Sequence, residues 1–383
     1  MLNVEKKKLL VAVDWYTPGY KAGGPIRSCV NLAFALQDIY NVYILTTDTD
    51  HGETEPYNNI TPDCWLTEQQ PGIEIYYARK KTISLKQTAN TIIGLDADYV
   101  YLNLLFSPYF VVYPLWLKYR RKIKSKVIVC PRGTLYDSAL SVKPLKKKLF
   151  LFFFRLLRIH KHIRFHATNE REKKAIEQHF PGSEIMIADN LPNPNQPAFV
   201  SCEKNEGSLK CIFISRIVPI KNLLFLLNAL QNVTANVQLT IIGPAENEMY
   251  WEECKKAITG LPPNIQTQYG GTKKNEELFL IIQQHHLFIL PTTGENFGHA
   301  IFEAMLAGRP VLISDQTPWL QLETKKAGWD LPLSNHQLFI NAIEESAEWD
   351  QQQFDDHAKA AWEYAHQFIT NPSLIEEYYK LFE

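Results

Sequence analysis

The chain has 383 residues, of which 45% are hydrophobic and 21% charged, with a formal net charge of −1. This length allows two domains with separate cores, and the composition is that of a globular protein rather than a disordered one. The near-neutral charge excludes a global attraction to nucleic acid or anionic membrane, so any such preference must be local. The six cysteines form no C-x-x-C pair, and no apolar run has the length of a signal peptide core or a membrane span. A cytoplasmic protein with reduced thiols is expected.

Apolar runs alternate with helical patterns and loops in the first half of the chain, which predicts an α/β architecture. The run at residues 9–13 predicts a buried first strand of a parallel sheet. A loop with Gly23 and Gly24 follows, and then a helix over 26–36. Further strands are expected at residues 42–45, 99–105 and 127–130, and a charged helix at 170–178.

Residues 190–197, rich in Pro and Asn, and the polar stretch 201–208 predict a linker between two domains. The alternation then restarts, which predicts a second doubly wound domain. Its expected strands are 210–215, 237–242, 265–268, 287–290 and 311–314, and its expected helices are 222–231, 250–258 and 276–284. The last helical segment, 357–382, is long for one helix and contains Pro372.

The most informative stretch is 291–313, in which Glu295 and Glu303 bracket a Phe297-Gly298 turn. A strand, a glycine turn and then a helix suit a phosphate, because a helix N-terminus presents unpaired amides and the positive end of a dipole. The two carboxylates suit hydroxyl groups, from which they accept strong hydrogen bonds. A sugar nucleotide fits this pattern, because its diphosphate lies between two polyols, the sugar and the ribose. The alternative is a buried strand and helix with incidental acids.

This stretch resembles the donor-site signature of retaining GT-B glycosyltransferases, glycosyltransferase family 4 in particular. In their pattern a Glu is followed by seven residues and a second Glu, with Phe-Gly after the first. The resemblance implies two Rossmann-like doubly wound domains that face a central cleft. It implies an acceptor-side domain at 1–195, completed by a C-terminal helix at about 364–383, and a nucleotide-sugar-binding domain at 208–363.

The same resemblance assigns roles to residues of the signature. It implies that Glu295 contacts the donor sugar and that Glu303 contacts the ribose hydroxyls. The residues between them that are expected at the donor site are Asn296, Phe297, Gly298 and His299.

Arg216 and Lys221 follow an expected strand and precede a helix, where both could converge on a diphosphate. Two fixed cations would stabilise the charge of a departing nucleoside diphosphate without a metal. The stretch looks like the Arg-x4-Lys motif of the family, and the alternative is two solvated surface cations.

Glycines mark two further loops. Gly23 and Gly24 in the first βα loop allow backbone amides to approach a phosphate closely, although such glycines are also common structural turns. The resemblance implies that this loop caps the donor phosphates. It also implies that Gly271 and the segment 243–246 lie near the nucleotide base, with a plain turn as an equal alternative for each.

The acceptor-side candidates are Arg132, in a Pro-Arg-Gly motif similar to that of relatives in surface-polysaccharide assembly, and Asp137. Many relatives carry a histidine near the donor sugar, and no equivalent is evident here. His160, His162 and His166 are expected to be surface or structural residues.

Two Asp-x-Asp tripeptides, at residues 48–50 and 96–98, look like the metal motif of the other main glycosyltransferase fold. Such tripeptides arise easily by chance, and Arg216 and Lys221 already supply positive charge. No metal and no cofactor are therefore expected.

Residues 143–164 combine an apolar run with many cations. The cations are Lys143, Lys146, Lys147, Lys148, Arg155, Arg158, Lys161 and Arg164. The combination suits an interfacial helix on anionic lipid, and a core helix with a solvated basic edge is an equal alternative. Nucleic-acid binding is not expected, because no recognition motif accompanies the charge.

These observations predict a retaining, metal-independent glycosyltransferase that moves a hexose-type sugar from a UDP- or GDP-sugar to a saccharide or lipid-linked saccharide, as in cell-surface polysaccharide synthesis. Peripheral contact with the inner face of the cell membrane is the accompanying hypothesis. The alternatives are a sugar-nucleotide isomerase or hydrolase on the same fold, and a non-catalytic partner subunit. Intact Glu295, Glu303, Arg216 and Lys221 argue against the last of these.

Overall fold

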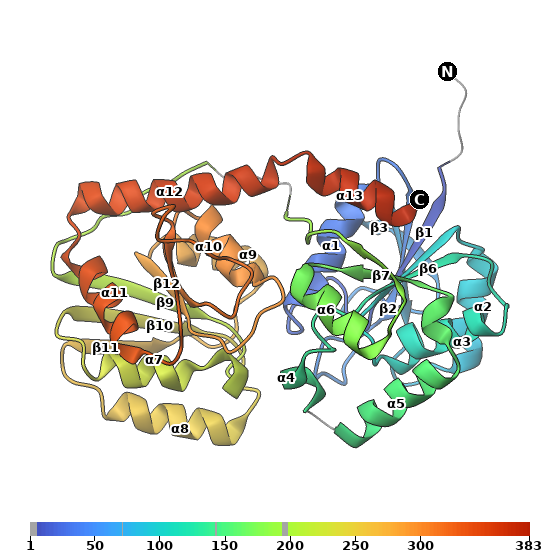
Figure 1. Cartoon of the computed structure of the whole chain (residues 1–383), viewed down its shortest axis with the longest axis horizontal. Helices are drawn as coiled ribbons and strands as arrows, with labels where there is room; N and C mark the ends of the chain where they lie inside the picture. Colours follow the sequence, from blue (N-terminus) through green and yellow to red (C-terminus); the bar gives the residue numbers. More distant parts are fainter. Residues whose placement is uncertain (1–5, 71, 142–143, 194–197) are drawn as a thin grey trace. The chain divides into compact units, whose positions relative to one another are not determined.

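The structure is a computed structural model that describes residues 6–70, 72–141, 144–193 and 198–383. It divides into two compact units, each with its own hydrophobic core (Figure 1). Unit 1 comprises Met1–Pro194 and Pro372–Glu383, and unit 2 comprises Asn195–Asn371. No helix among the described residues is both long enough and apolar enough to cross a membrane.

Unit 1 contains, within its described residues, an eight-stranded sheet with the order β3-β4-β2-β1-β5-β6-β7-β8. All neighbours pair in parallel except β3 and β4, which are antiparallel. The strands are β1 (Lys8–Ala12), β2 (Asn41–Thr47), β3 (Trp65–Gln70), β4 (Ile73–Ala78), β5 (Tyr99–Asn103), β6 (Lys126–Cys130), β7 (Arg164–Ala167) and β8 (Glu184–Ile187). The central strands β1 and β5 are almost wholly buried, because helices cover both faces of a doubly wound sheet.

The helices of unit 1 follow its strands. They are α1 (Gly24–Leu36), α2 (Leu85–Leu95), α3 (Tyr113–Tyr119), α4 (Asp137–Leu140), α5 (Pro144–Leu156), α6 (Glu170–His179) and α13 (Ser373–Phe382), with the short helices η1 (Pro108–Val112) and η2 (Ile159–Lys161). The strands β3, β4, β7 and β8 were not expected from the sequence.

Unit 2 contains, as far as it is described, a six-stranded parallel sheet with the order β11-β10-β9-β12-β13-β14. The strands are β9 (Ser208–Ile214), β10 (Asn236–Ile242), β11 (Ile265–Tyr269), β12 (Leu287–Leu290), β13 (Val311–Ser314) and β14 (Gly328–Leu331). The helices are η3 (Pro219–Lys221), α7 (Leu223–Leu230), α8 (Glu248–Thr259), α9 (Asn275–Ile282), α10 (His299–Leu306), α11 (His336–Glu348) and α12 (Gln351–Ile369). Figure 1 shows α9, α10 and α12 on one face of this sheet and α7 and α8 on the other.

Each sheet has a point where the strand order reverses. In unit 2, β9 lies between β10 and β12, so the chain builds first to one side of β9 and then to the other. In unit 1, β1 holds the same position between β2 and β5. Ligands of open α/β sheets bind outside the carboxyl ends of the strands at this point. The predicted α/β architecture with two doubly wound parallel sheets is thus confirmed.

The ends of the second unit differ from the expected boundaries. The chain returns to unit 1 at Pro372, later than the expected return near residue 364, because α12 continues unbroken to Ile369. Pro372 lies between α12 and α13, where proline cannot continue a helix. The helical segment at 357–382, which is long for one helix, is therefore divided between α12 and α13.

The expected linker is only partly a linker. Residues 194–197 lie outside the described part of the chain. The stretch 201–208 is instead part of unit 2 and is hydrogen-bonded to it. The buried Lys204 ammonium donates to the carbonyls of Ala347 and Trp349, at 2.9 and 2.8 Å. These carbonyls lie at the end of α11, where backbone acceptors lack helical partners.

Candidate functional site

The carboxyl edge of the unit 2 sheet brings together loops that are distant in sequence. Lys221 comes from the loop after β9, and Glu295 comes from the loop after β12. Because β9 and β12 are neighbours at the reversal point, the two loops lie side by side. The candidate site is therefore built where this topology favours a ligand.

Lys221 and Glu295 form an ion pair between Nζ and Oε1, and their side chains are only 12% and 14% exposed. Lys221 ends η3, and Asn222 then takes a left-handed backbone with φ of 60°. An ammonium has three donors, so one bond to Glu295 leaves two for a ligand oxygen. The carboxylate keeps lone pairs for a hydroxyl group. The pair can thus bridge an anion and a polyol.

The two loops are fixed to each other through one carbonyl. Ile220 O accepts hydrogen bonds from Thr293 N at 2.8 Å and from Thr292 Oγ1 at 3.0 Å. Glu295 N donates to Gln316 O at 3.0 Å, which ties the loop to the segment after β13. These contacts hold Lys221 and Glu295 in place before any ligand arrives. Sequence reasoning missed Thr292 and Thr293, whose roles depend on the neighbouring loop.

Helix α10 begins directly after Gly298, which has φ of 79°. This left-handed backbone favours glycine at the sharp turn into the helix, and a Cβ atom there would also lie 2.8 Å from Ile301 Cδ1. His299 is the first residue of α10, and the partly exposed Glu303 lies one turn further along. Asn296 lies in the loop that precedes this turn. The amides at the start of α10 therefore follow Glu295 closely in the chain.

An aromatic cluster packs against the loop that contains Phe297. Trp319 Nε1 donates to Phe297 O at 2.5 Å, and the Trp319 ring stacks on Phe302 at 5.3 Å. Phe297 and Phe368 also contact Trp319. The side chain of Phe297 is buried in this cluster, whereas the sequence analysis placed it at the donor site. Its side chain anchors the loop, because the large apolar ring is removed from water.

Arg216, which was expected to converge with Lys221 on a diphosphate, pairs through its Nη1 with Glu246 Oε2 at 3.0 Å. Glu246 comes from the loop after β10, on the other side of β9. The pairing uses one of five N–H donors, so others are available to a ligand. Arg216 is 42% exposed, so it can reorient easily.

Gly243 allows the loops after β9 and β10 to pack closely. It has φ of 139°, and an added Cβ would lie 1.9 Å from Ser215 O. Its N–H donates to Gly271 O at 2.9 Å, and its carbonyl accepts from Tyr269 Oη at 2.9 Å. Gly271, with φ of 65°, thus takes part in the backbone contacts at this edge. Trp251 packs on Tyr269 at 4.7 Å, which leaves an aromatic surface beside them.

The predicted residues of unit 1 lie on a separate sheet. Gly23 precedes α1 with φ of 66°, and Gly24 is the first residue of that helix. A Cβ at Gly23 would meet no atom within 4 Å, so the space beside it is open. Asp137 is exposed at the start of the short helix α4.

Arg132 belongs to a network of polar side chains within unit 1. Its guanidinium donates to Asn103 Oδ1 at 2.8 Å, to Asn190 Oδ1 and to Tyr101 Oη at 3.3 Å. Tyr101 Oη also contacts His166 Nδ1 at 2.6 Å. These protein oxygens hold Arg132 in place, so its first role is to join the ends of β5, β6 and β8.

Asp14 is a candidate that the sequence analysis did not single out. It follows β1 at the reversal point of the unit 1 sheet, and Oδ1 accepts from Ser107 Oγ at 2.8 Å. Burial raises the pKa of the Asp14 carboxyl, although Ser107 and the charges of Lys80 and His51 oppose this. Its position directly after the first strand was the available signal.

The acids of both Asp-x-Asp tripeptides shape the backbone. Asp48 accepts from Lys80 N, and Asp50 accepts from Tyr20 N at 2.9 Å. Asp98 Oδ2 accepts from Lys8 N at 2.8 Å. The part of the chain that is described holds no group of three or more metal-ligating side chains.

The three histidines named above differ in setting. His160 and His166 are buried, so neither is a surface residue. His166 is held between Tyr101 and the carbonyl of Ala188, and its burial lowers the pKa to about 3. A ring that is neutral at physiological pH and bonded on both nitrogens has a structural role.

Comparison with known proteins relates this architecture to sugar transfer. Residues 208–348, which contain the Lys221–Glu295 pair, match the family model described as Glycosyl transferases group 1. A Klebsiella pneumoniae protein described as an uncharacterized 41.2 kDa protein in the cps region is 22% identical over 264 residues, which cover 63% of this chain and 70% of that protein.

Solved structures resemble nearly the whole chain. The structure of HepE from Anabaena in complex with UDP and glucose has a TM-score of 0.70 at 16% identity and covers 98% of this chain and 99% of its own. WaaG, a glycosyltransferase involved in lipopolysaccharide biosynthesis, has a TM-score of 0.68 at 13% identity, with coverage of 98% and 99%. The chain therefore has the GT-B fold, as the sequence predicted.

Proposed function

We propose that this protein is a retaining glycosyltransferase of family 4 that transfers a hexose-type sugar from a nucleoside-diphosphate sugar. The observation that carries the proposal is the Lys221–Glu295 pair at the reversal point of unit 2, inside the segment that matches group 1 glycosyl transferases. A cation beside a carboxylate suits a ligand that joins a diphosphate to a polyol. A sugar nucleotide has this composition.

The donor would be held by unit 2. Lys221, the amides at the start of α10 and a reoriented Arg216 would bind the diphosphate, because each offers N–H donors to its oxygens. Glu295 would accept hydrogen bonds from the sugar, and Glu303 from the ribose. Because HepE was solved with UDP, a UDP-sugar is the first donor to test, with a GDP-sugar next.

The reaction would be a front-face substitution at the anomeric carbon. The bond to the leaving phosphate oxygen breaks, the acceptor oxygen bonds to the same face, and the acceptor proton passes to the departing phosphate. Lys221 would stabilise the charge that develops on the leaving group, which removes the need for a metal. Retention of the anomer in the product, followed by NMR, tests this path. A trapped glycosyl-enzyme adduct would refute it.

We assign acceptor recognition to unit 1, with Asp14 as the first candidate and the Arg132 network as its support. A carboxylate that keeps an accepting oxygen suits a sugar hydroxyl. The acceptor would be a saccharide or lipid-linked saccharide in surface-polysaccharide synthesis, because the Klebsiella relative is described as a protein in a cps region and WaaG acts in lipopolysaccharide biosynthesis. Asp14→Asn should raise the acceptor KM and leave donor affinity unchanged.

The decisive experiment is calorimetry with UDP, GDP, ADP, dTDP and their common sugar conjugates, with EDTA present. Base-selective binding without metal supports the proposal and names the nucleotide. Binding that appears only when a divalent metal is added overturns metal independence. Turnover of the donor without any acceptor would favour an isomerase or hydrolase, and no binding would favour a non-catalytic partner subunit.

A further inference from the structure

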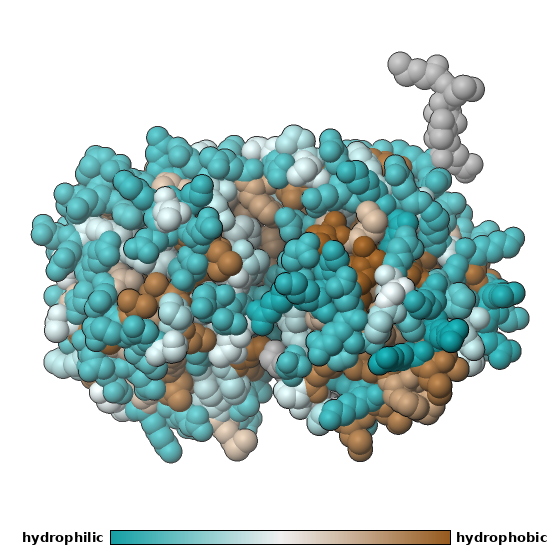
Figure 2. Space-filling model, in the orientation of Figure 1, coloured by the Kyte–Doolittle hydropathy of each residue, from teal (hydrophilic) through white to brown (hydrophobic). Residues whose placement is uncertain are grey.

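Helix α5 of unit 1 carries an apolar ridge on its outer face. The α5 ridge consists of five side chains that are between 47% and 81% exposed, namely Leu145, Leu149, Phe152, Phe153 and Leu156. Positions 145, 149, 152 and 156 are three or four residues apart, so they share one face of the helix. Figure 2 shows brown side chains gathered over this part of the molecule. Contiguous exposed apolar surface of this kind marks an interaction site.

The ridge is not needed to hold α5 in place. The opposite face of the helix packs inward through Phe150 and Phe154, whose rings lie 5.4 Å from Phe106 and 5.0 Å from Phe180. Among the described side chains of α5, Phe154 is the one that is buried. The core-helix alternative is therefore wrong for the outer face. The sequence could not distinguish an interfacial helix from a core helix, because residues 149–154 are apolar all round the helix.

The charges around the ridge have one sign. Between Asp137 and Glu170 the chain contains no Asp or Glu, while residues 143–164 carry the cluster of Lys and Arg described above. Lys143 itself lies outside the described residues. A local cationic surface thus exists on a chain whose net charge is close to zero.

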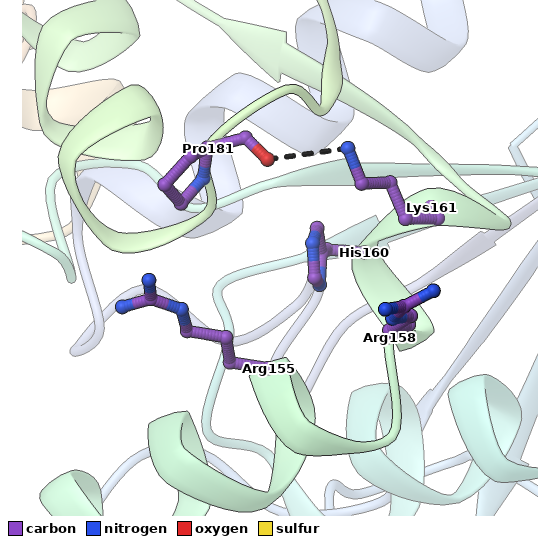
Figure 3. Close-up of a pocket in the computed structure, with 5 residues that line it drawn as sticks. All are labelled: Arg155, Arg158, His160, Lys161 and Pro181. Atoms are coloured by element: carbon purple, nitrogen blue, oxygen red, sulfur yellow. Dashed lines mark hydrogen bonds between the residues drawn. The ribbon is translucent and has the colours of Figure 1, made fainter.

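A cationic hollow of about 560 Å³ lies where α5 ends. It is lined by Arg155, Arg158, His160, Lys161 and Pro181. Figure 3 shows Arg155 and Arg158 on either side of His160, with Lys161 Nζ bonded to Pro181 O at 3.2 Å. His160 is 4% exposed, and its Nδ1 has no hydrogen-bond partner among the residues that the structure describes. The two guanidinium groups suit an anion with several oxygens.

We propose that the α5 ridge and the cationic hollow together form a docking surface for an anionic lipid bilayer. The ridge enters the boundary between headgroups and acyl chains, and the hollow receives a lipid phosphate. Arg155 of the hollow and Leu156 of the ridge are consecutive residues at the end of α5, so the two features adjoin in the chain. This surface belongs to unit 1 and includes none of the donor residues of unit 2, and the inference does not depend on the proposed function.

The charge pattern favours lipid over a second copy of this chain as the partner. A symmetric dimer places the same patch of each subunit against the other. Through this face it would oppose two sets of like charges, which costs energy, while an anionic leaflet attracts every cation at the surface.

The test is co-sedimentation of the full-length protein with vesicles of phosphatidylcholine, with and without phosphatidylglycerol. We expect binding to the anionic vesicles that weakens with salt. Phe152→Ser combined with Phe153→Ser should lower the partition coefficient about tenfold or more. Arg155→Gln combined with Arg158→Gln should lower it about fivefold for each charge. All four side chains are on the outer surface, and thermal unfolding will verify that the variants fold.

Matched controls lie on α2 of the same unit, where Leu85 is 49% exposed and Lys86 is also exposed. Leu85→Ser and Lys86→Gln should leave vesicle binding unchanged. Equal binding by the wild type and the Phe152/Phe153 variant, or equal binding to neutral and anionic vesicles, would overturn the proposal. So would a wild-type dimer that the same variant dissociates in the absence of any vesicle binding, since that result assigns the ridge to self-association.

Discussion

A double-mutant cycle on Lys221 and Glu295 tests the centre of the candidate site. With side chains only 12% and 14% exposed, the pair lies between surface ion pairs and fully buried ones. Surface pairs contribute about 0.2–1 kcal/mol, whereas removing one partner of a buried pair costs about 3–5 kcal/mol. We therefore expect Lys221→Met and Glu295→Gln each to reduce the free energy of unfolding by about 1–3 kcal/mol, and the double variant to lose less than their sum.

The assay is thermal unfolding of the four proteins, together with calorimetry of UDP and of the UDP-sugar that binds best. Lys221→Met should weaken both ligands, because both carry the diphosphate. Glu295→Gln should weaken the sugar conjugate and have little effect on UDP, because its proposed partner is the sugar. Single effects on unfolding that add within about 0.5 kcal/mol would refute the coupling. Equal losses for UDP and the conjugate in Glu295→Gln would refute its role at the sugar.

Three further expectations follow from the structure. Glu303→Ala should weaken nucleotide binding by about 1–3 kcal/mol in calorimetry if the carboxylate holds the ribose, and unchanged affinity would remove that role. Trp319→Leu should reduce the free energy of unfolding by about 2–4 kcal/mol, because it loses the bond to Phe297 O and the stacked rings, and an unchanged melting temperature would contradict this. Burial lowers the pKa of His166 to about 3 and that of His286 to about 4, so the unfolded chain binds these protons near pH 6.5 and the folded chain does not. The stability that these rings contribute should therefore be full above pH 6.5 and fall below it by about 1.4 kcal/mol per histidine and pH unit. Burial raises the pKa of Asp189 to about 6, which acts in the opposite direction, so an equal denaturant midpoint at pH 7.5 and pH 5.5 in an Asp189→Asn background would contradict the histidine effect.

The central strands were predictable because parallel strands covered on both faces are mostly apolar, as at β1 and β12. The pairing of Arg216 with Glu246 was not predictable, because it depends on which strands become neighbours and on the direction of two exposed side chains. Nor does a motif show that the ring of Phe297 turns inward, since an apolar residue in a loop fits a ligand contact and a core contact equally well.

The backbone, rather than the charged side chains, sets the distance between the two loops of the site. Neighbouring strands lie about 4.8 Å apart, so loops that leave β9 and β12 at the same edge begin close together. The carbonyl of Ile220 then accepts from both Thr292 and Thr293, which removes the remaining freedom between the loops. The backbone at positions 221 and 295 is therefore held in place even when one of the two side chains is replaced. For this reason a loss of binding in their variants reports on chemistry at the ligand, and not on collapse of the site.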